Sequence, residues 1–282
     1  MRDDLGHGRG GAPGNADEAN WPGRGLLPDL AACLRFYSRL PVPRLHGEGD
    51  IHAAPDFRTA PRMLPLAGLI LALPAALTLL AARGLGLGPF LAAALAVTVM
   101  VLVTGALHED GLADLADGCG GATRERRLEI MRDSRLGSYG AIALALSLIL
   151  RIGALATLAD RLGAPAAAAL LLAASLSRGL ALAPLALLPP ARADGASASV
   201  GRPTRETLGF AAVLGATILG LSLAVLPLAG VLSALVCAGL AVLAVTAFAR
   251  RRLGGQTGDV IGASQQAGEI AALVGLLAAL QA

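Results

Sequence analysis

Carboxylates at helical spacing are the clearest chemical feature of this 282-residue sequence. The segment Asp110-Gly-Leu-Ala-Asp114-Leu-Ala-Asp117 places acidic side chains at positions i, i+4 and i+7. On an α-helix these positions lie on one face, within about 60° of each other. Like charges on one face repel unless a cation lies among them. Because oxygen ligands without His or Cys suit hard cations, the pattern predicts a site for Mg²⁺ or Mn²⁺ held by Asp110, Asp114 and Asp117.

This interpretation assumes that the apolar run before the acidic segment continues into it as one helix. Glu109 then points roughly 100° away from the other carboxylates and is expected to be solvated. Gly111 and Gly118 have no side chain, so a substrate could approach the backbone there. A solvated acidic loop that balances nearby arginines is the alternative to a metal site.

A second pattern follows about fifteen residues later and is typical of phosphate binding. Arg132, Ser134, Arg135 and Gly137 immediately precede an apolar run. A helix that begins here offers free N–H groups and a favourable dipole, and the guanidinium groups can pair with phosphate oxygens. The alternative is an ordinary positively charged segment that flanks a membrane span.

Three further charged residues lie in or beside apolar runs. Arg151 and Arg178 fall inside them, and because burying arginine in a bilayer is costly, both are expected to face inward and to contact substrate. Snorkelling to the membrane surface is the alternative. Asp259, in Gly-Gly-Gln-Thr-Gly-Asp, could join the Asp110 cluster. Carboxylates for a divalent ion and arginines for phosphates indicate metal-assisted phosphoryl or nucleotidyl transfer.

The composition indicates which elements must position these residues. Hydrophobic residues make up 55% of the chain and charged residues 15%, whereas soluble domains carry about 25% charged residues. The sequence therefore predicts an all-α polytopic integral membrane helix bundle. Six or seven transmembrane spans are expected, since a span needs about 20 apolar residues. The candidate runs are 64–82, 90–107, 137–159, 164–188, 209–227, 230–249 and 260–281, the last being the weakest because it contains Ser264, Gln265, Gln266 and Glu269.

Arginine distribution predicts the orientation of the chain. The loops 108–136, 189–208 and 250–259 are rich in arginine and the alternate loops are not. This bias places the N-terminus and the acidic segment in the cytoplasm. Residues 1–25 are expected to form a disordered tail, and 26–282 a single membrane-embedded catalytic domain. A net charge of +3 is too small to indicate nucleic acid. A homo-oligomer is neither indicated nor excluded.

On these residues the sequence closely resembles the cobalamin synthases, also called adenosylcobinamide-GDP ribazoletransferases. The resemblance covers about 30 to 280. Its core is Thr104-Gly-Ala-Leu-His-Glu-Asp110-Gly-Leu-Ala-Asp114-Leu-Ala-Asp117-Gly118, and it also includes Phe36-Tyr-Ser-Arg39-Leu-Pro-Val-Pro43, Ile130-Met-Arg-Asp133-Ser-Arg135-Leu-Gly137 and Gly254-Gly-Gln-Thr-Gly-Asp259. The sequence departs from the commoner family wording at Glu109 and Cys119.

The resemblance implies a Mg²⁺-dependent enzyme of the bacterial inner membrane, with its active site facing the cytoplasm. It would join adenosylcobinamide-GDP to α-ribazole or α-ribazole 5′-phosphate and release GMP, in the last steps of cobalamin biosynthesis. Asp133 or Asp259 would then accept the proton of the attacking hydroxyl, and Arg132 and Arg135 would neutralise phosphate charge.

Two other functions are compatible with parts of the pattern. A CDP-alcohol phosphotransferase has a related acidic motif, but its Ala-Arg pair after the first Asp-Gly and its later paired Asp are missing here. A transporter of polar solutes would place its polar residues near the middle of the bilayer. Here most of them cluster at one predicted edge, although Arg151 and Arg178 do not.

Overall fold

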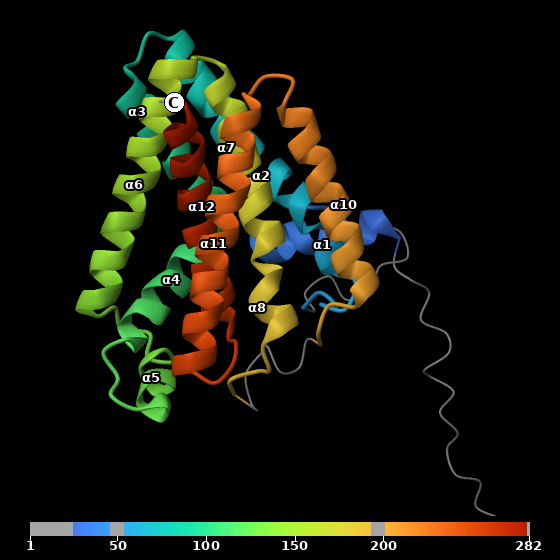
Figure 1. Cartoon of the computed structure of the whole chain (residues 1–282), viewed down its shortest axis with the longest axis vertical. Helices are drawn as coiled ribbons and strands as arrows, with labels where there is room; N and C mark the ends of the chain where they lie inside the picture. Colours follow the sequence, from blue (N-terminus) through green and yellow to red (C-terminus); the bar gives the residue numbers. More distant parts are fainter. Residues whose placement is uncertain (1–24, 46–53, 193–200, 281–282) are drawn as a thin grey trace, which may run out of the picture.

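A computed structural model describes residues 25–45, 54–192 and 201–280 of the chain. These residues form a bundle of α-helices joined by short connections (Figure 1). The elements are α1 (Leu26–Tyr37), the 3₁₀ helix η1 (Ala60–Met63), α2 (Leu64–Gly84), α3 (Pro89–Thr104), α4 (Leu107–Gly118), α5 (Arg124–Ile130), α6 (Ser138–Leu162), α7 (Pro165–Leu180), α8 (Leu182–Leu187), α10 (Arg205–Ser222), α11 (Leu228–Arg252) and α12 (Gly258–Ala279). The tail predicted for residues 1–25 lies almost entirely outside the described residues.

Long apolar helices confirm the predicted membrane architecture. Five segments of the described chain are long and apolar enough to cross a bilayer, namely Ala60–Gly84, Ser138–Leu162, Pro165–Leu187, Leu228–Arg252 and Gly258–Ala279. The bent pair formed by α3 and α4 makes a sixth if it is counted as one span. Leucine and valine side chains on the outer faces of α6 and α11 are exposed, as expected of surfaces that face lipid.

The helix at the centre of the bundle is α12, which has the lowest mean hydropathy of the five candidate spans in the described chain. α12 packs against α4, α6, α7 and α11 (Figure 1). Its polar side chains Gln265, Gln266 and Glu269 are buried against polar partners on neighbouring helices instead of facing lipid. A central helix can carry such residues because the bundle, and not the lipid, satisfies their hydrogen bonds.

The acidic segment does not continue α3, as the sequence analysis assumed. Gly105 and Ala106 both adopt left-handed backbone conformations, with φ of 63° and 58°, and α4 leaves at an angle of 89° to α3. A side chain at Gly105 would collide with the Arg39 side chain, so glycine fits this position for both conformation and space. The break allows α4 to run across the bundle toward α12.

Three connections that the arginine bias assigned to one side of the membrane meet at one end of the bundle. Pro190 and Gln256 form an isolated bridge between the segments after α8 and before α12. Arg124, at the start of α5, donates from Nε to the Leu253 carbonyl at 2.6 Å and from Nη2 to the Ala191 carbonyl at 2.7 Å. Arg124 therefore holds α5 beside the acidic helix by joining two other connections.

Candidate active site

The candidate site lies where α4 crosses α12. A Cβ atom added to Gly111 would lie 3.0 Å from Cα and 3.1 Å from the carbonyl oxygen of Asp259. On the other helix, a Cβ atom on Gly262 would lie 3.4 Å from the Gly111 and His108 Cα atoms. The two glycines let the helices touch backbone to backbone. The close approach predicted at Gly111 is thus made by α12 and not by a substrate.

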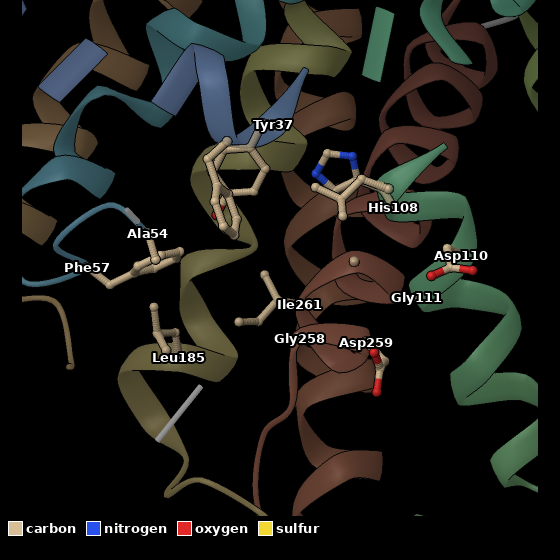
Figure 2. A pocket seen from close by; sticks show the side chains of 13 residues that line it. Tyr37, Ala54, Phe57, His108, Asp110, Gly111, Leu185, Gly258, Asp259 and Ile261 are labelled. Atoms are coloured by element: carbon tan, nitrogen blue, oxygen red, sulfur yellow. The ribbon is translucent and has the colours of Figure 1, made fainter. Parts of the chain in front are cut away.

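Carboxylates from both helices line one cavity beside this crossing. The cavity has a volume of about 210 Å³, and Asp110 of α4 and Asp259 of α12 both line it (Figure 2). Asp114, one turn further along α4, is partly buried, and the negative charges of Asp110 and Asp259 act on it. The Thr257 hydroxyl caps α12 by accepting from the Val260 N–H at 3.3 Å, and it lies 3.1 Å from Oδ2 of Asp259.

Asp117 has a different environment from the carboxylates it was grouped with. Its Oδ2 accepts from the Gly137 N–H and its Oδ1 from the Gly140 N–H, each at 2.8 Å. The carboxylate therefore occupies the N-terminus of α6, where the helix dipole favours negative charge. The sequence analysis predicted that this helix end binds a phosphate. In the structure the Asp117 carboxylate occupies it and accepts from the Gly137 N–H.

The set of carboxylates suits a hard cation that keeps water or substrate ligands. Among the described residues, no group of three His, Cys, Asp or Glu side chains is close enough to hold an ion by itself. Mg²⁺ in phosphate-processing sites usually takes one or two carboxylates and completes its shell with water and substrate phosphates. Asp110 and Asp114, with Asp259 facing them, offer that chemistry, because their mutual repulsion is relieved by positive charge.

The predicted phosphate-binding residues surround a second depression, of about 530 Å³, near the far end of α4. Arg132 and Arg135 line it together with Asp117 and Gly137, whereas Ser134 is exposed nearby. The Arg135 guanidinium binds the Asp133 carboxylate, with Nε 3.0 Å from Oδ1, and this lowers the pKa of Asp133 to about 2. Asp133 is therefore a weak proton acceptor, and the prediction that Asp133 or Asp259 acts as the base is narrowed to Asp259.

Charged residues inside the bundle form a buried network. Arg151 of α6 donates to Oε1 of Glu109 at 2.7 Å and lies 2.8 Å from Oε1 of Glu269. Arg178 of α7 lies 3.7 Å from Oε2 of the same Glu269. Glu109 is thus buried and paired, and the expectation that it is solvated is wrong, because the bend before α4 turns it into the bundle.

The network also changes what Arg151 and Arg178 can do. Both face inward as predicted, but their guanidinium groups interact with carboxylates in a group whose two positive and two negative charges balance. Gln265 and Gln266 add hydrogen bonds to Glu269 and Ser147. The two arginines therefore hold α4, α6, α7 and α12 together. Arg178 also lines a small cavity with Tyr37 and His108, and a contact of either arginine with substrate stays a prediction.

Sequence reasoning did not single out three residues that the structure places at the site. Tyr37 and His108 line the cavity, and their rings stack with centroids 5.7 Å apart and planes 6° apart. Arg192 lies near enough for its charge to act on both Asp114 and Asp259, while its Nη2 donates to the Leu128 carbonyl at 2.7 Å. The available signal for Tyr37 and His108 was their place inside the two family motifs quoted above, whereas Arg192 stands alone in the sequence and joins the site only through folding.

The glycine crossing gives a prediction. Gly111→Ala is expected to destabilise the protein by about 1–3 kcal/mol and to lower turnover, because the added methyl group meets backbone atoms of α12 that cannot rotate away. Thermal unfolding in detergent and an activity assay would measure both effects. Gly153→Ala in α6 is the matched control, since nothing lies within 4 Å of its Cβ position. A stable, active Gly111→Ala variant would show that the close crossing does not matter.

Comparison with known proteins identifies the family of this chain. The sequence profile of the family described as cobalamin-5-phosphate synthase matches residues 29–277. The chain belongs to this family. It is 52% identical over 256 residues to the adenosylcobinamide-GDP ribazoletransferase of Azorhizobium caulinodans, an alignment that covers 89% of this chain and 96% of that relative. It is 47% identical over 254 residues to the protein of that name from Mesorhizobium japonicum, covering 89% and 93%.

The family match spans all the elements that build the site. The matched range of the cobalamin-5-phosphate synthase family runs from α1, which supplies Tyr37, to the end of α12, which supplies Asp259. No solved structure matches the chain.

Proposed function

We propose that this protein is an adenosylcobinamide-GDP ribazoletransferase that acts in the last steps of cobalamin biosynthesis. It joins adenosylcobinamide-GDP to α-ribazole or α-ribazole 5′-phosphate, giving adenosylcobalamin or its 5′-phosphate and GMP. One observation carries the proposal beyond the family match: the crossing of α4 and α12 places Asp110 and Asp259 on one cavity, with Asp114 close by. Clustered carboxylates of this kind suit the transfer of a phosphoryl-linked group.

The chemistry exchanges one phosphorus–oxygen bond for another. A ribose hydroxyl of the acceptor attacks the phosphorus that carries the cobinamide, and the bridging bond breaks so that GMP leaves with the electron pair. The hydroxyl proton passes to a carboxylate, for which Asp259 is placed because it lines the cavity beside Asp110. Arg132, Arg135 and Arg192 supply positive charge for the phosphates.

We assign the divalent ion to Asp110 and Asp114. These two carboxylates would hold Mg²⁺, and the ion would supply positive charge that offsets the charge of the diphosphate and of the leaving GMP. Asp117, predicted as the third ligand, serves instead to cap α6 and to fix the end of α4.

The direct test is an assay of the purified full chain in detergent. Adenosylcobinamide-GDP, α-ribazole and Mg²⁺ are mixed, and GMP release is followed. We expect release that requires both substrates and that EDTA stops. No GMP release from active, folded protein would refute the activity, and release that EDTA leaves unchanged would refute the metal assignment. Incorporation of label from a CDP-alcohol into lipid would instead favour the related phosphotransferases.

We further propose that the site faces the cytoplasm at the inner membrane, and Cys119 offers a test. Cys119 directly follows α4 and is exposed, whereas Cys33 is buried. A membrane-impermeant maleimide is expected to label Cys119 in inside-out vesicles and not in right-side-out ones. Because partial burial of the thiol in this otherwise exposed residue raises the pKa of Cys119, and the thiolate is the nucleophile, labelling should speed up with rising pH.

Mass spectrometry of the labelled chain locates the modified thiol, and Cys119→Ser removes the signal. Labelling of Cys119 from right-side-out vesicles would place the acidic helix on the opposite side of the membrane. The arginine-rich loops would then lie outside the cytoplasm, contrary to the orientation that the arginine distribution predicts.

A further inference from the structure

The cavity at the helix crossing has two unlike sides. Asp110 and Asp259 lie on one side, and aromatic rings lie on the other (Figure 2). Phe36 packs edge-on against Tyr37 at 4.8 Å and against Phe57 at 5.5 Å between ring centroids. The rest of the lining is mainly hydrocarbon, contributed by Ala54, Leu107, Leu185 and Ile261. Such a lining favours a flat apolar ring system whose polar attachment reaches the carboxylates.

Polar groups buried at this cavity are available to a ligand. The Tyr37 side chain is 8% exposed and that of His108 is 3% exposed. Both side chains line the cavity and their rings stack on each other, and neither is among the fully enclosed side-chain atoms that lack a partner in the described parts of the chain, so their polar atoms are open to the cavity. Since buried polar groups are nearly always hydrogen-bonded, their partners are expected to come from a bound molecule or from water.

Charge separates this cavity from the region that suits phosphates. None of the described residues that line it is an arginine. The depression lined by Arg126, Arg132 and Arg135 lies beyond the other end of α4, a helix of 12 residues and therefore about 18 Å long. An uncharged ring is therefore favoured at the cavity, whereas the phosphates of the other substrate extend from Asp110 and Asp114 along α4 toward the arginines.

Size points to a single ring system. A volume of about 210 Å³ is below the roughly 300–1,000 Å³ of pockets that hold drug-sized ligands. A corrinoid is much larger than this and cannot enter. Guanine has polar groups on both of its edges, and only one side of the cavity is polar, so the edge against Leu185 and Ile261 would stay unpaired. A benzimidazole with methyl groups on its outer edge has one ring nitrogen to satisfy and matches the lining.

We infer that this cavity binds the heteroaromatic base of the nucleoside acceptor, with Tyr37 and His108 as its polar contacts. The inference rests on the proposed function. The methyl-bearing edge of the base packs on Phe57, Leu185 and Ile261, and its free ring nitrogen accepts from the Tyr37 hydroxyl. The attached ribose then projects toward Asp110 and Asp259, where its hydroxyl loses its proton. Base recognition and deprotonation thus share one cavity.

A cavity-filling substitution tests this placement. Ile261→Phe is expected to raise the KM for α-ribazole by roughly 10- to 200-fold, the usual effect of a misfit methylene in an apolar pocket. The KM for adenosylcobinamide-GDP should stay within about twofold, since the corrinoid and guanine bind elsewhere. The same substitution should raise the KM for the riboside of unmethylated benzimidazole by less than it raises the KM for α-ribazole. Val274→Phe is the matched control, because Val274 is exposed on the same helix.

A second variant keeps the test independent of repacking around Ile261. Tyr37→Phe retains the ring and its stacking but removes the hydroxyl, and it is expected to raise the KM for α-ribazole about tenfold, the equivalent of one hydrogen bond. A rise in the KM for adenosylcobinamide-GDP alone would place guanine in the cavity and overturn the inference. Unchanged KM values for both substrates in both variants would also overturn it.

Failure of the inference can be told apart from failure of the proposed function. The wild-type chain must release GMP from adenosylcobinamide-GDP for the function to stand, whichever cavity holds the base. The variants are therefore compared in the same assay, and only a wild-type protein without activity bears on the function itself.

Discussion

Asp110→Asn and Asp114→Asn are expected to lower GMP release by about 10²- to 10⁴-fold, the range by which a positioned acid, base or electrostatic group changes a rate. Each substitution keeps the shape of the side chain and removes the negative charge that attracts a divalent ion. Asp259→Asn should have an effect of the same size, because the amide cannot accept the proton of the attacking hydroxyl. Initial rates at saturating substrates, with Mg²⁺ varied, would measure the losses.

The protein should remain folded in these variants. Asp110 is exposed and Asp114 is partly buried, so removing a charge from a mutually repelling group costs little stability. Unfolding temperatures in detergent close to that of the wild type would separate lost chemistry from lost structure. Wild-type turnover in Asp110→Asn and Asp259→Asn together would refute the roles assigned to this cavity.

Asp117→Asn is the matched control on the same helix. The amide oxygen can still accept one of the two hydrogen bonds from α6, so we expect a loss of about 1 kcal/mol of stability and most of the turnover retained. Its apparent affinity for Mg²⁺ should match that of the wild type. A loss as large as that of Asp114→Asn, with weakened Mg²⁺ dependence, would restore Asp117 to the metal site that helical spacing predicted.

The buried network predicts the largest effect on stability. Arg151→Met is expected to destabilise the protein by about 3–5 kcal/mol, because it leaves Glu109 and Glu269 as buried carboxylates with too little positive charge. That is a large part of the 5–15 kcal/mol that typically holds a folded domain together. Unfolding in detergent and the yield of folded protein in the membrane would measure it.

Two variants make the interpretation specific. Arg161→Met applies the same change near the exposed end of α6 and should stay within about 0.5 kcal/mol of the wild type. The double variant Arg151→Met with Glu109→Leu removes one charge of each sign and leaves Glu269 beside Arg178, so it should recover much of the loss. An Arg151→Met protein as stable as the wild type would show that the network does not hold the four helices together.

Several features of this protein could be predicted because their causes are local. A bilayer requires long apolar helices, so composition and run length indicate a polytopic bundle from the sequence alone. Helical periodicity likewise predicts that Asp110 and Asp114 share a face, and both lie on α4 as expected. The family resemblance rests on the same kind of local pattern and was confirmed by the comparisons.

Residues that meet across helices could not be paired in this way. Spacing grouped Asp117 with its neighbours in sequence, but the fold brings the N-terminus of α6 to Asp117 and Asp259 to the other two aspartates. Helical spacing predicted that Glu109 is a surface residue. The bend at Gly105 and Ala106 instead directs its side chain into the bundle, where it binds Arg151. Polar residues made α12 the weakest span in sequence, and the same residues place it at the centre of the bundle.

The physical reason is that a helix period specifies a direction around one axis and says nothing about which other helix lies there. The sequence by itself determined that the chain lies in a membrane, that it forms long apolar helices, and that α4 has an acidic face. The tertiary structure decided which charges neutralise one another and which are left for chemistry, because that depends on contacts such as Gly111 against Gly262 between residues far apart in the chain.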